Sequence, residues 1–203
     1  LCGDRLTGFE LMSRQSVEFV LRHVAGVSDP FADTHPWYVL IELSDTQPNA
    51  PLNELLEEGL GGAFEQGVAL DAVVAASDAQ VRALWALREG ISEAQNHEGP
   101  SLKHDISVPV SRIPDFIERT DAALQQAFPG VRIVAYGHVG DGNLHYNISK
   151  PIGAEDVAFK AQAEAIMRVI YDQTLNYAGS ISAEHGLGHS KRLAAQHYKA
   201  PLE

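Results

Sequence analysis

Two histidines flank a glycine-rich turn in the stretch from Gly137 to Asn147, GHVGDGNLHYN. Asp141 followed by Gly142 is a strong signal for a two-residue β-hairpin loop, because a type I′ turn needs positive φ at both central positions. With these two residues as the loop, His138 lies directly opposite His145, with Cβ atoms about 4.5–5.5 Å apart. Two imidazoles at that separation can bind one ion, so the hairpin predicts half of a metal site.

A metal ion held by two histidines needs at least one more ligand, and the stretch ISAEHGLGHSKR (181–192) offers Glu184. Adjacent residues of an extended chain point to opposite sides, so Glu184 and His185 should serve different roles. We expect Glu184 to be the third ligand and His185 to be a proton-transfer group near the ion. The structural alternatives are a pair of core histidines beside a turn and a surface Glu-His dipeptide.

The composition restricts the classes of partner. The 203 residues carry a net charge of −12, without clusters of Lys and Arg, which argues against nucleic acid and anionic membrane surfaces as partners. The only cysteine, Cys2, excludes an intrachain disulfide framework and any zinc or iron–sulfur site built from several cysteines. The apolar runs are too short to cross a bilayer, so we expect no integral membrane segment.

The hydrophobic periodicity predicts the elements that must position these residues. Ser77 and Gln80 fit a capping box at a helix start. We expect helices over 9–24, 52–66, 77–96, 111–128, 154–178 and 190–198, strands over 37–43, 68–76 and 103–110, a hairpin within 131–149 and an extended piece at 180–182. Strands separated by helices, with one hairpin, predict an α+β fold: a ferredoxin-like α/β sandwich with a mostly antiparallel sheet covered by helices.

Several stretches together resemble a known family. They are FELMSR near the start, WALREGISEA and KHDISVPVSRIPDF in the middle, and YGHVGDGNLHYNIS and SAEHGLG followed by KR near the end. Their order and spacing resemble the C-terminal substrate domain of the FAD-linked oxidases of the vanillyl-alcohol-oxidase type. The resemblance is strongest to the D-2-hydroxy-acid dehydrogenases, which include the D-lactate and D-2-hydroxyglutarate dehydrogenases.

The resemblance implies a role for each matching residue. It implies a divalent metal, with zinc the first choice, bound by His138, His145 and Glu184, and it implies that His185 is the general base. It also implies that the substrate carboxylate is bound by Arg88, Ser92, Lys103 and Asn147. The FAD of this family is bound mainly by an N-terminal domain, so we expect residues 1–203 to be the substrate and metal domain, without that N-terminal domain and without the extreme C-terminus.

The residues themselves are compatible with these roles. Arg88 and Ser92 are four positions apart on one predicted helix and share a face. An arginine is suited to gripping a carboxylate at two points. The alternatives are an Arg88 that is solvated or paired with a glutamate, and a Lys103 that protects the edge of a strand. Two histidines and a glutamate suit zinc, manganese and iron alike.

The resemblance predicts the substrate- and metal-binding part of an FAD-dependent dehydrogenase that oxidises a D-2-hydroxy acid, of the lactate or 2-hydroxyglutarate type, to the 2-oxo acid. Its partners would be the small hydroxy acid and an electron acceptor, with a homodimer as one assembly and a bacterial cytoplasm or a mitochondrion as its compartment. A zinc-dependent hydrolase using the same three ligands is one alternative. A non-catalytic carboxylate-binding module is the other.

Overall fold

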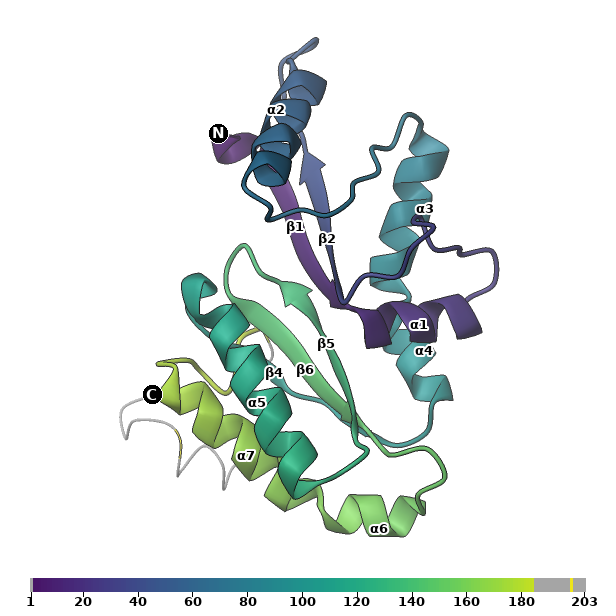
Figure 1. The fold of residues 1–203 in the computed structure, drawn as a ribbon, viewed down its shortest axis with the longest axis vertical. Coiled ribbons are helices and arrows are strands. Elements are labelled where there is room, and N and C mark those ends of the chain that lie inside the picture. The colour runs from purple at the N-terminus through teal and green to yellow at the C-terminus, as the bar shows by residue number, and fades with distance from the viewer. Residues whose placement is uncertain (1, 185–197, 199–203) are drawn as a thin grey trace.

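A computed structural model describes residues 2–184 and 198 of the chain. Its strands form one antiparallel sheet in the order β2-β1-β5-β6-β3, with β4 also paired to β6 (Figure 1). The strands are β1 (Leu6–Ser13), β2 (Trp37–Leu43), β3 (Ser101–Leu102), β4 (Asp105–Ser107), β5 (Arg132–His138) and β6 (Asn143–Ser149). The helices are α1 (Arg14–His23), α2 (Leu52–Glu65), α3 (Asp78–Glu89), α4 (Ile91–His97), α5 (Ile113–Ala127), α6 (Asp156–Ala161) and α7 (Ala163–Asn176).

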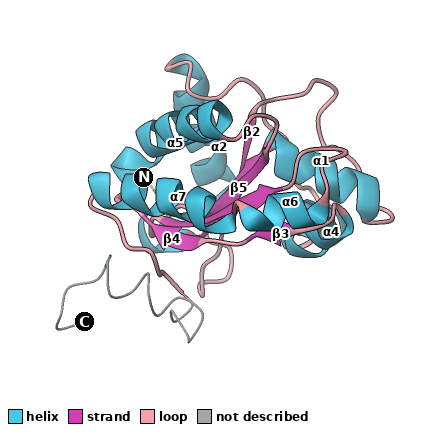
Figure 2. Ribbon diagram, turned by 90° about the horizontal axis from the view of Figure 1, so that it is seen from below, coloured by secondary structure: helices cyan, strands magenta, loops and turns pink. Residues whose placement is uncertain are grey.

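Helices cover both faces of the sheet. Leu144, Tyr146 and Ile148 of β6 belong to the core that α5 and α7 complete. Val134 and Tyr136 of β5 belong to a second core, with α1, α3 and α4. Figure 1 shows the two groups of helices on opposite sides of β5 and β6, and Figure 2 shows the strands running between them. The predicted α+β sandwich with a mostly antiparallel sheet is therefore confirmed.

The prediction of one helix over 9–24 was wrong in its first part. Residues 9–13 belong to β1, and the helix begins only at Arg14. Ser13 caps this helix, because its side chain accepts a hydrogen bond from the Ser16 backbone N–H at 3.3 Å. Apolar side chains of β1 pack on both faces of the sheet: Phe9 and Leu11 against the core that α5 and α7 complete, and Met12 within the second core. Such a short apolar run cannot be told from a buried helix by periodicity alone.

The strand predicted over 68–76 is absent, and this segment is irregular. Val68 and Leu70 are 77% and 76% exposed. A run rich in valine forms a strand only where a neighbouring strand accepts its backbone hydrogen bonds. The expected element at 103–110 is likewise reduced to β4, and the helices expected over 77–96 and 154–178 are each divided in two, as α3 and α4 and as α6 and α7.

The hairpin joins β5 and β6 as predicted, but with another register. Its loop spans four residues, 139–142, and Tyr136, not His138, lies opposite His145. Only Gly142 in this loop has a positive φ, of 84°, whereas a type I′ turn requires two such residues. Because side chains alternate along a strand, the shift by two residues leaves both histidines on the same face of the sheet.

A cluster around Glu98 connects α1, α4 and β5. The Glu98 carboxylate accepts hydrogen bonds from Arg22 and Arg132, and one of its oxygens lies 2.7 Å from His23 Nε2. Burial opposes its charge, but the hydrogen bonds from His23, Arg132 and Arg22 outweigh burial and lower the pKa of Glu98 to about 2. The cluster therefore fixes the end of α4, the helix that carries Ser92, against the sheet.

Replacing Glu98 with glutamine is expected to lower the free energy of unfolding at pH 7 by about 2 kcal/mol, because charged hydrogen bonds are lost. A carboxylate whose pKa is lowered in the folded state stabilises the fold above its unfolded pKa, and this contribution disappears as the pH falls through the folded value. The difference between wild type and variant should thus shrink between pH about 4.5 and about 2. Urea unfolding across this range measures it, and Glu93→Gln, an exposed residue of the same helix, is the matched control. Equal effects of the two variants would contradict the prediction.

Candidate metal centre

The three predicted metal ligands meet at one point. His138 ends β5 and His145 lies on β6. Glu184 lies four residues after Ser180, which forms a bridge to Ser107, the last residue of β4. Glu184 Oε1 lies 3.4 Å from His138 Nε2, and Oε2 lies 3.9 Å from His145 Nε2. Potential ligand atoms of all three residues lie within 4.8 Å of one another.

This spacing fits a divalent ion. Ligand atoms about 2.1 Å from a tetrahedral ion lie about 3.4 Å from one another, so the observed 3.4 and 3.9 Å need little closure. His145 is 17% exposed, while His138 and Glu184 are 40% and 44% exposed, so the group is open on one side. That side faces a cavity of about 490 Å³, whose lining includes Gly8, Phe9, His138 and Glu184. Among the residues that the structure describes, three candidate ligands beside a cavity leave a position for a further ligand.

Both histidines direct one ring nitrogen to a buried carboxylate. His138 Nδ1 lies 2.6 Å from Glu10 Oε1, and His145 Nδ1 lies 3.9 Å from Asp105 Oδ1. Asp105 Oδ2 also accepts a hydrogen bond from the Glu184 backbone N–H at 3.0 Å. In metal sites such partners orient the imidazole ring and fix which nitrogen is free to bind. Here they leave Nε2 of each histidine facing Glu184.

The electrostatics of His145 also suit a ligand. Burial lowers the pKa of His145, and the positive charge of Arg88 acts in the same direction, against the carboxylates of Asp105 and Glu184. The neutral imidazole is therefore the favoured form. A histidine must be neutral at the nitrogen that binds a metal.

Three of the predicted substrate residues surround Tyr136, which lies next to the two histidines. The Arg88 guanidinium carbon lies 4.8 Å from the centre of the Tyr136 ring, which is itself 4.9 Å from the His145 ring centre. Burial raises the pKa of Tyr136, while Arg88, Ser92 and Asn147 act in the opposite direction. The three residues therefore interact with the Tyr136 hydroxyl on the side of the sheet that carries the two histidines.

Lys103, the fourth predicted substrate residue, lies next to this group. Its Nζ is 3.5 Å from Ser92 Oγ and 3.3 Å from Asn96 Oδ1, so it packs against α4. The helix face predicted for Arg88 and Ser92 is interrupted, because the two residues lie on α3 and α4, on either side of Gly90. The structure nevertheless brings all four residues to the same face of the sheet.

Asn147 is more deeply buried than a substrate ligand need be. It is 2% exposed, and its Oδ1 accepts a hydrogen bond from the His104 backbone N–H at 3.0 Å. Its Nδ2 donates to Gln95 Oε1, also at 3.0 Å. These contacts connect β6 with α4 and with the chain before β4. The role of Asn147 in binding substrate stays a prediction.

Two predictions fall on residues that the structure does not describe. They are the proton-transfer role of His185 and the final helix over 190–198, of which only residue 198 is described.

The sequence interpretation gave no role to Glu10, Asp105 or Tyr136. Glu10 and Asp105 are 5% and 7% exposed, although carboxylates are seldom buried without a partner. Glu10 was assigned to the wrong element, a helix. A lone glutamate in the apolar run FELM was the available signal, because a charged residue among core residues predicts a buried ion pair.

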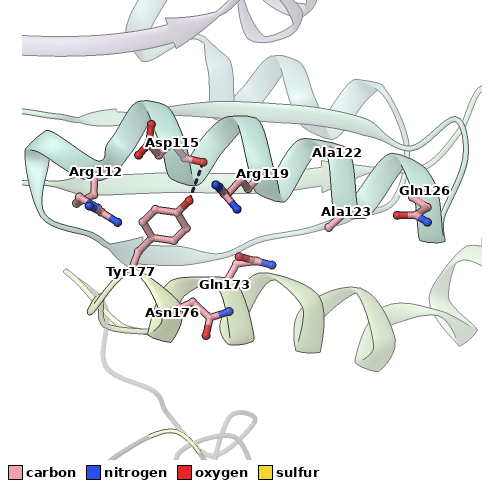
Figure 3. Close-up of a pocket in the computed structure, with 9 residues that line it drawn as sticks. All are labelled: Arg112, Asp115, Arg119, Ala122, Ala123, Gln126, Gln173, Asn176 and Tyr177. Carbon is pink, nitrogen blue, oxygen red and sulfur yellow. Dashed lines mark hydrogen bonds between the residues drawn. The ribbon is translucent and has the colours of Figure 1, made fainter.

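A second cavity, of about 590 Å³, lies between α5 and α7 on the other side of the sheet. Figure 3 shows Arg112 and Arg119 on either side of Tyr177, whose hydroxyl donates to the Asp115 carbonyl oxygen at 3.1 Å. None of the predicted site residues lines this cavity. We therefore place the candidate site at the histidine and glutamate group.

Comparison with known proteins shows what the chain resembles. Residues 3–203 match the family described as FAD linked oxidases, C-terminal domain. The chain is 40% identical over 192 residues to D-2-hydroxyglutarate dehydrogenase of Xanthomonas citri pv. viticola, covering 93% of this chain and 39% of that protein. It is 38% identical over 201 residues to the protein of that name from Stutzerimonas stutzeri, covering 98% and 42%.

The mitochondrial D-2-hydroxyglutarate dehydrogenase of Danio rerio is 36% identical over 195 residues, covering 95% of this chain and 34% of that protein. The chain thus spans about two fifths or less of the length of these three relatives. Within the described part of the chain, no helix is long and apolar enough to span a membrane.

Proposed function

The chain belongs to the family of FAD linked oxidases, C-terminal domain, and from this we propose that it forms the substrate- and metal-binding part of an FAD-dependent dehydrogenase. The reaction proposed is the oxidation of a D-2-hydroxy acid to the 2-oxo acid. The relatives named D-2-hydroxyglutarate dehydrogenase support this class of substrate. The observation that carries the proposal is the distance of 3.5 Å between Arg88 Nη2 and His138 Nε2. His138 is one of the three candidate metal ligands, so the guanidinium lies directly beside them.

The chemistry divides between the cofactors and this chain. When bound, a divalent ion would lower the pKa of the substrate hydroxyl, and FAD would accept the hydride. His138, His145 and Glu184 would hold the ion, and His185 would take the hydroxyl proton. Arg88 would bind the substrate carboxylate, and its position beside His138 would hold the hydroxy acid next to the ion.

We further propose that the substrate is a dicarboxylate of the 2-hydroxyglutarate type. The chain offers a second cation, Lys103, which is connected through Ser92 to the same group as Arg88. Two cations near one site can bind the two carboxylates of a dicarboxylic acid. The chain has a net charge of −12, so an anionic substrate needs such local positive charge. D-Lactate has only one carboxylate, so it could bind only one of these two cations.

Kinetics with two substrates test this assignment. In the full-length protein that carries this chain, loaded with FAD and zinc, Lys103→Ala is expected to raise KM for D-2-hydroxyglutarate about tenfold or more, as charged hydrogen bonds are lost. KM for D-lactate should change little. The assay follows reduction of an artificial electron acceptor, with L-2-hydroxyglutarate as the stereochemical control. Equal changes for both D-acids would refute the dicarboxylate assignment.

The same preparation tests the reaction class. Oxidation of a D-2-hydroxy acid that requires FAD supports the dehydrogenase. No turnover of any D-2-hydroxy acid with both cofactors bound would overturn it and favour the carboxylate-binding module, whereas hydrolysis by the zinc-loaded protein without FAD would favour the hydrolase.

A further inference from the structure

We propose that Glu10 is a positioning residue that couples the metal ligands to the substrate-binding arginine, an inference that rests on the proposed function. Its two carboxylate oxygens bind different partners. Oε1 lies 2.6 Å from His138 Nδ1, and Oε2 accepts a hydrogen bond from Arg88 Nε at 2.7 Å. One buried carboxylate thus contacts both a candidate metal ligand and the residue proposed to bind the substrate carboxylate.

The sheet itself fixes where Glu10 lies. In the pairing of β1 with β5, Glu10 lies directly opposite His138, with both side chains on the same face. Met12 lies opposite Tyr136 in the same register. The contact therefore depends on the backbone pairing of two adjacent strands, which is a firmer support than a flexible surface loop.

The contact with His138 determines which nitrogen faces the ion. An ionised carboxylate only accepts hydrogen bonds, so the hydrogen between Glu10 and His138 belongs on Nδ1. Nε2 then carries the lone pair, with Glu184 Oε1 at 3.4 Å and Arg88 Nη2 at 3.5 Å. Without Glu10, the ring of His138 could rotate or take the other tautomer, and its affinity for the metal would fall.

The contact with Arg88 holds the guanidinium in place. Glu10 is 5% and Arg88 is 9% exposed, so the pair is buried and each charge depends on the other. Because Glu10 occupies Nε, the guanidinium is oriented with Nη2 beside His138. Glu10 therefore sets the distance between the substrate carboxylate and the metal ligands.

Glu10→Gln tests this role, because glutamine keeps the shape but has only one accepting oxygen. It can accept from His138 or from Arg88, and its NH₂ group must then face the other donor. In the full-length protein we expect zinc affinity, measured by competition with a chromophoric chelator, to fall about 10- to 100-fold. At saturating zinc, KM for D-2-hydroxyglutarate should stay raised about tenfold, since Arg88 remains misoriented.

A matched control is Glu42→Gln. Glu42 lies opposite Gly8 in the pairing of β2 with β1, on the same face as Glu10. The Glu42→Gln substitution therefore removes the same charge at a nearby position. Its zinc affinity and KM should match those of wild type. If the Glu10→Gln protein does not fold, Glu10→Asp replaces it, because aspartate keeps the charge but has a shorter side chain. Glu10→Asp should weaken zinc binding less than Glu10→Gln.

The outcomes separate this inference from the proposed function. A wild-type protein that binds neither zinc nor manganese would overturn the metal centre, and the inference with it. If wild type binds zinc, and the folded Glu10 variants have the same zinc affinity and the same KM as wild type, the metal centre stands and the role of Glu10 is refuted. Equal defects in the Glu42 and Glu10 variants would also refute it, because the effect would then arise from charge alone.

Discussion

Replacing His138 with alanine is expected to remove the bound metal and to lower kcat/KM for the hydroxy acid by about 10³-fold or more. Two ligands would be left, His145 and Glu184, and a catalytic zinc site normally has three protein ligands. A bound ion would supply several kcal/mol of charge stabilisation, and each 1.4 kcal/mol corresponds to about tenfold in rate. The same loss is expected for His145→Ala and for Glu184→Gln.

Metal content by mass spectrometry measures the first part of this prediction. Wild type should carry about one divalent ion per chain, and each of the three variants should carry none. His97→Ala is the matched control, because His97 is exposed on α4 and stacks on His23, away from the three ligands. If wild type fails to bind zinc or manganese, the hairpin histidines are structural. If the variants retain the ion, other residues hold it.

Two glycines of the hairpin loop should respond very differently to alanine. Gly142 has a φ of 84°, and a Cβ atom at this position would lie 2.3 Å from the Val108 carbonyl oxygen. Left-handed backbone and a steric clash together predict a loss of about 2–5 kcal/mol in the free energy of unfolding for Gly142→Ala. At Gly140 the nearest atom to such a Cβ is Phe9 Cβ, at 3.8 Å, so Gly140→Ala should cost less than about 1 kcal/mol.

Chemical unfolding followed by metal analysis checks this pair. The loop joins the strands that carry both histidines, so Gly142→Ala should also reduce metal content, while Gly140→Ala should leave it unchanged. Similar stabilities for the two variants would show that the loop adapts to a side chain at Gly142. The steric argument would then be wrong.

Much of the site could be predicted from local patterns. The sequence located both strands of the hairpin, and it placed His138 and His145 on one face although their register was wrong by two residues. An even shift in register preserves the face of a strand, so the conclusion survived the error. The capping pattern at Ser77 held in its first half, since Ser77 accepts from the Gln80 N–H. The Gln80 side chain accepts from the Ala76 N–H, one residue before the Ser77 N–H that a capping box uses.

The residues behind the ligands could not be predicted in this way. Glu10 reaches His138 across 128 positions of sequence, through the pairing of β1 with β5. No local periodicity records which distant strands become neighbours. Asp105 was missed for the same reason, since it meets Glu184 across 79 positions. The exposed run over 68–76 shows the opposite error, a strand predicted where none forms. Its composition suggests a strand, but it has no neighbouring strand to pair with.

The distant pairing of β1 with β5 also determines the order in which the site can assemble. The hairpin that carries both histidines is contiguous in the chain, and hairpins of this kind form within about 1–10 μs. Glu10 joins His138 only after the two ends of the long intervening segment have come together, a step whose entropic cost slows folding. We therefore expect the two imidazoles to come together before the arginine meets its carboxylate, so that an ion could be captured before the acid can be recognised.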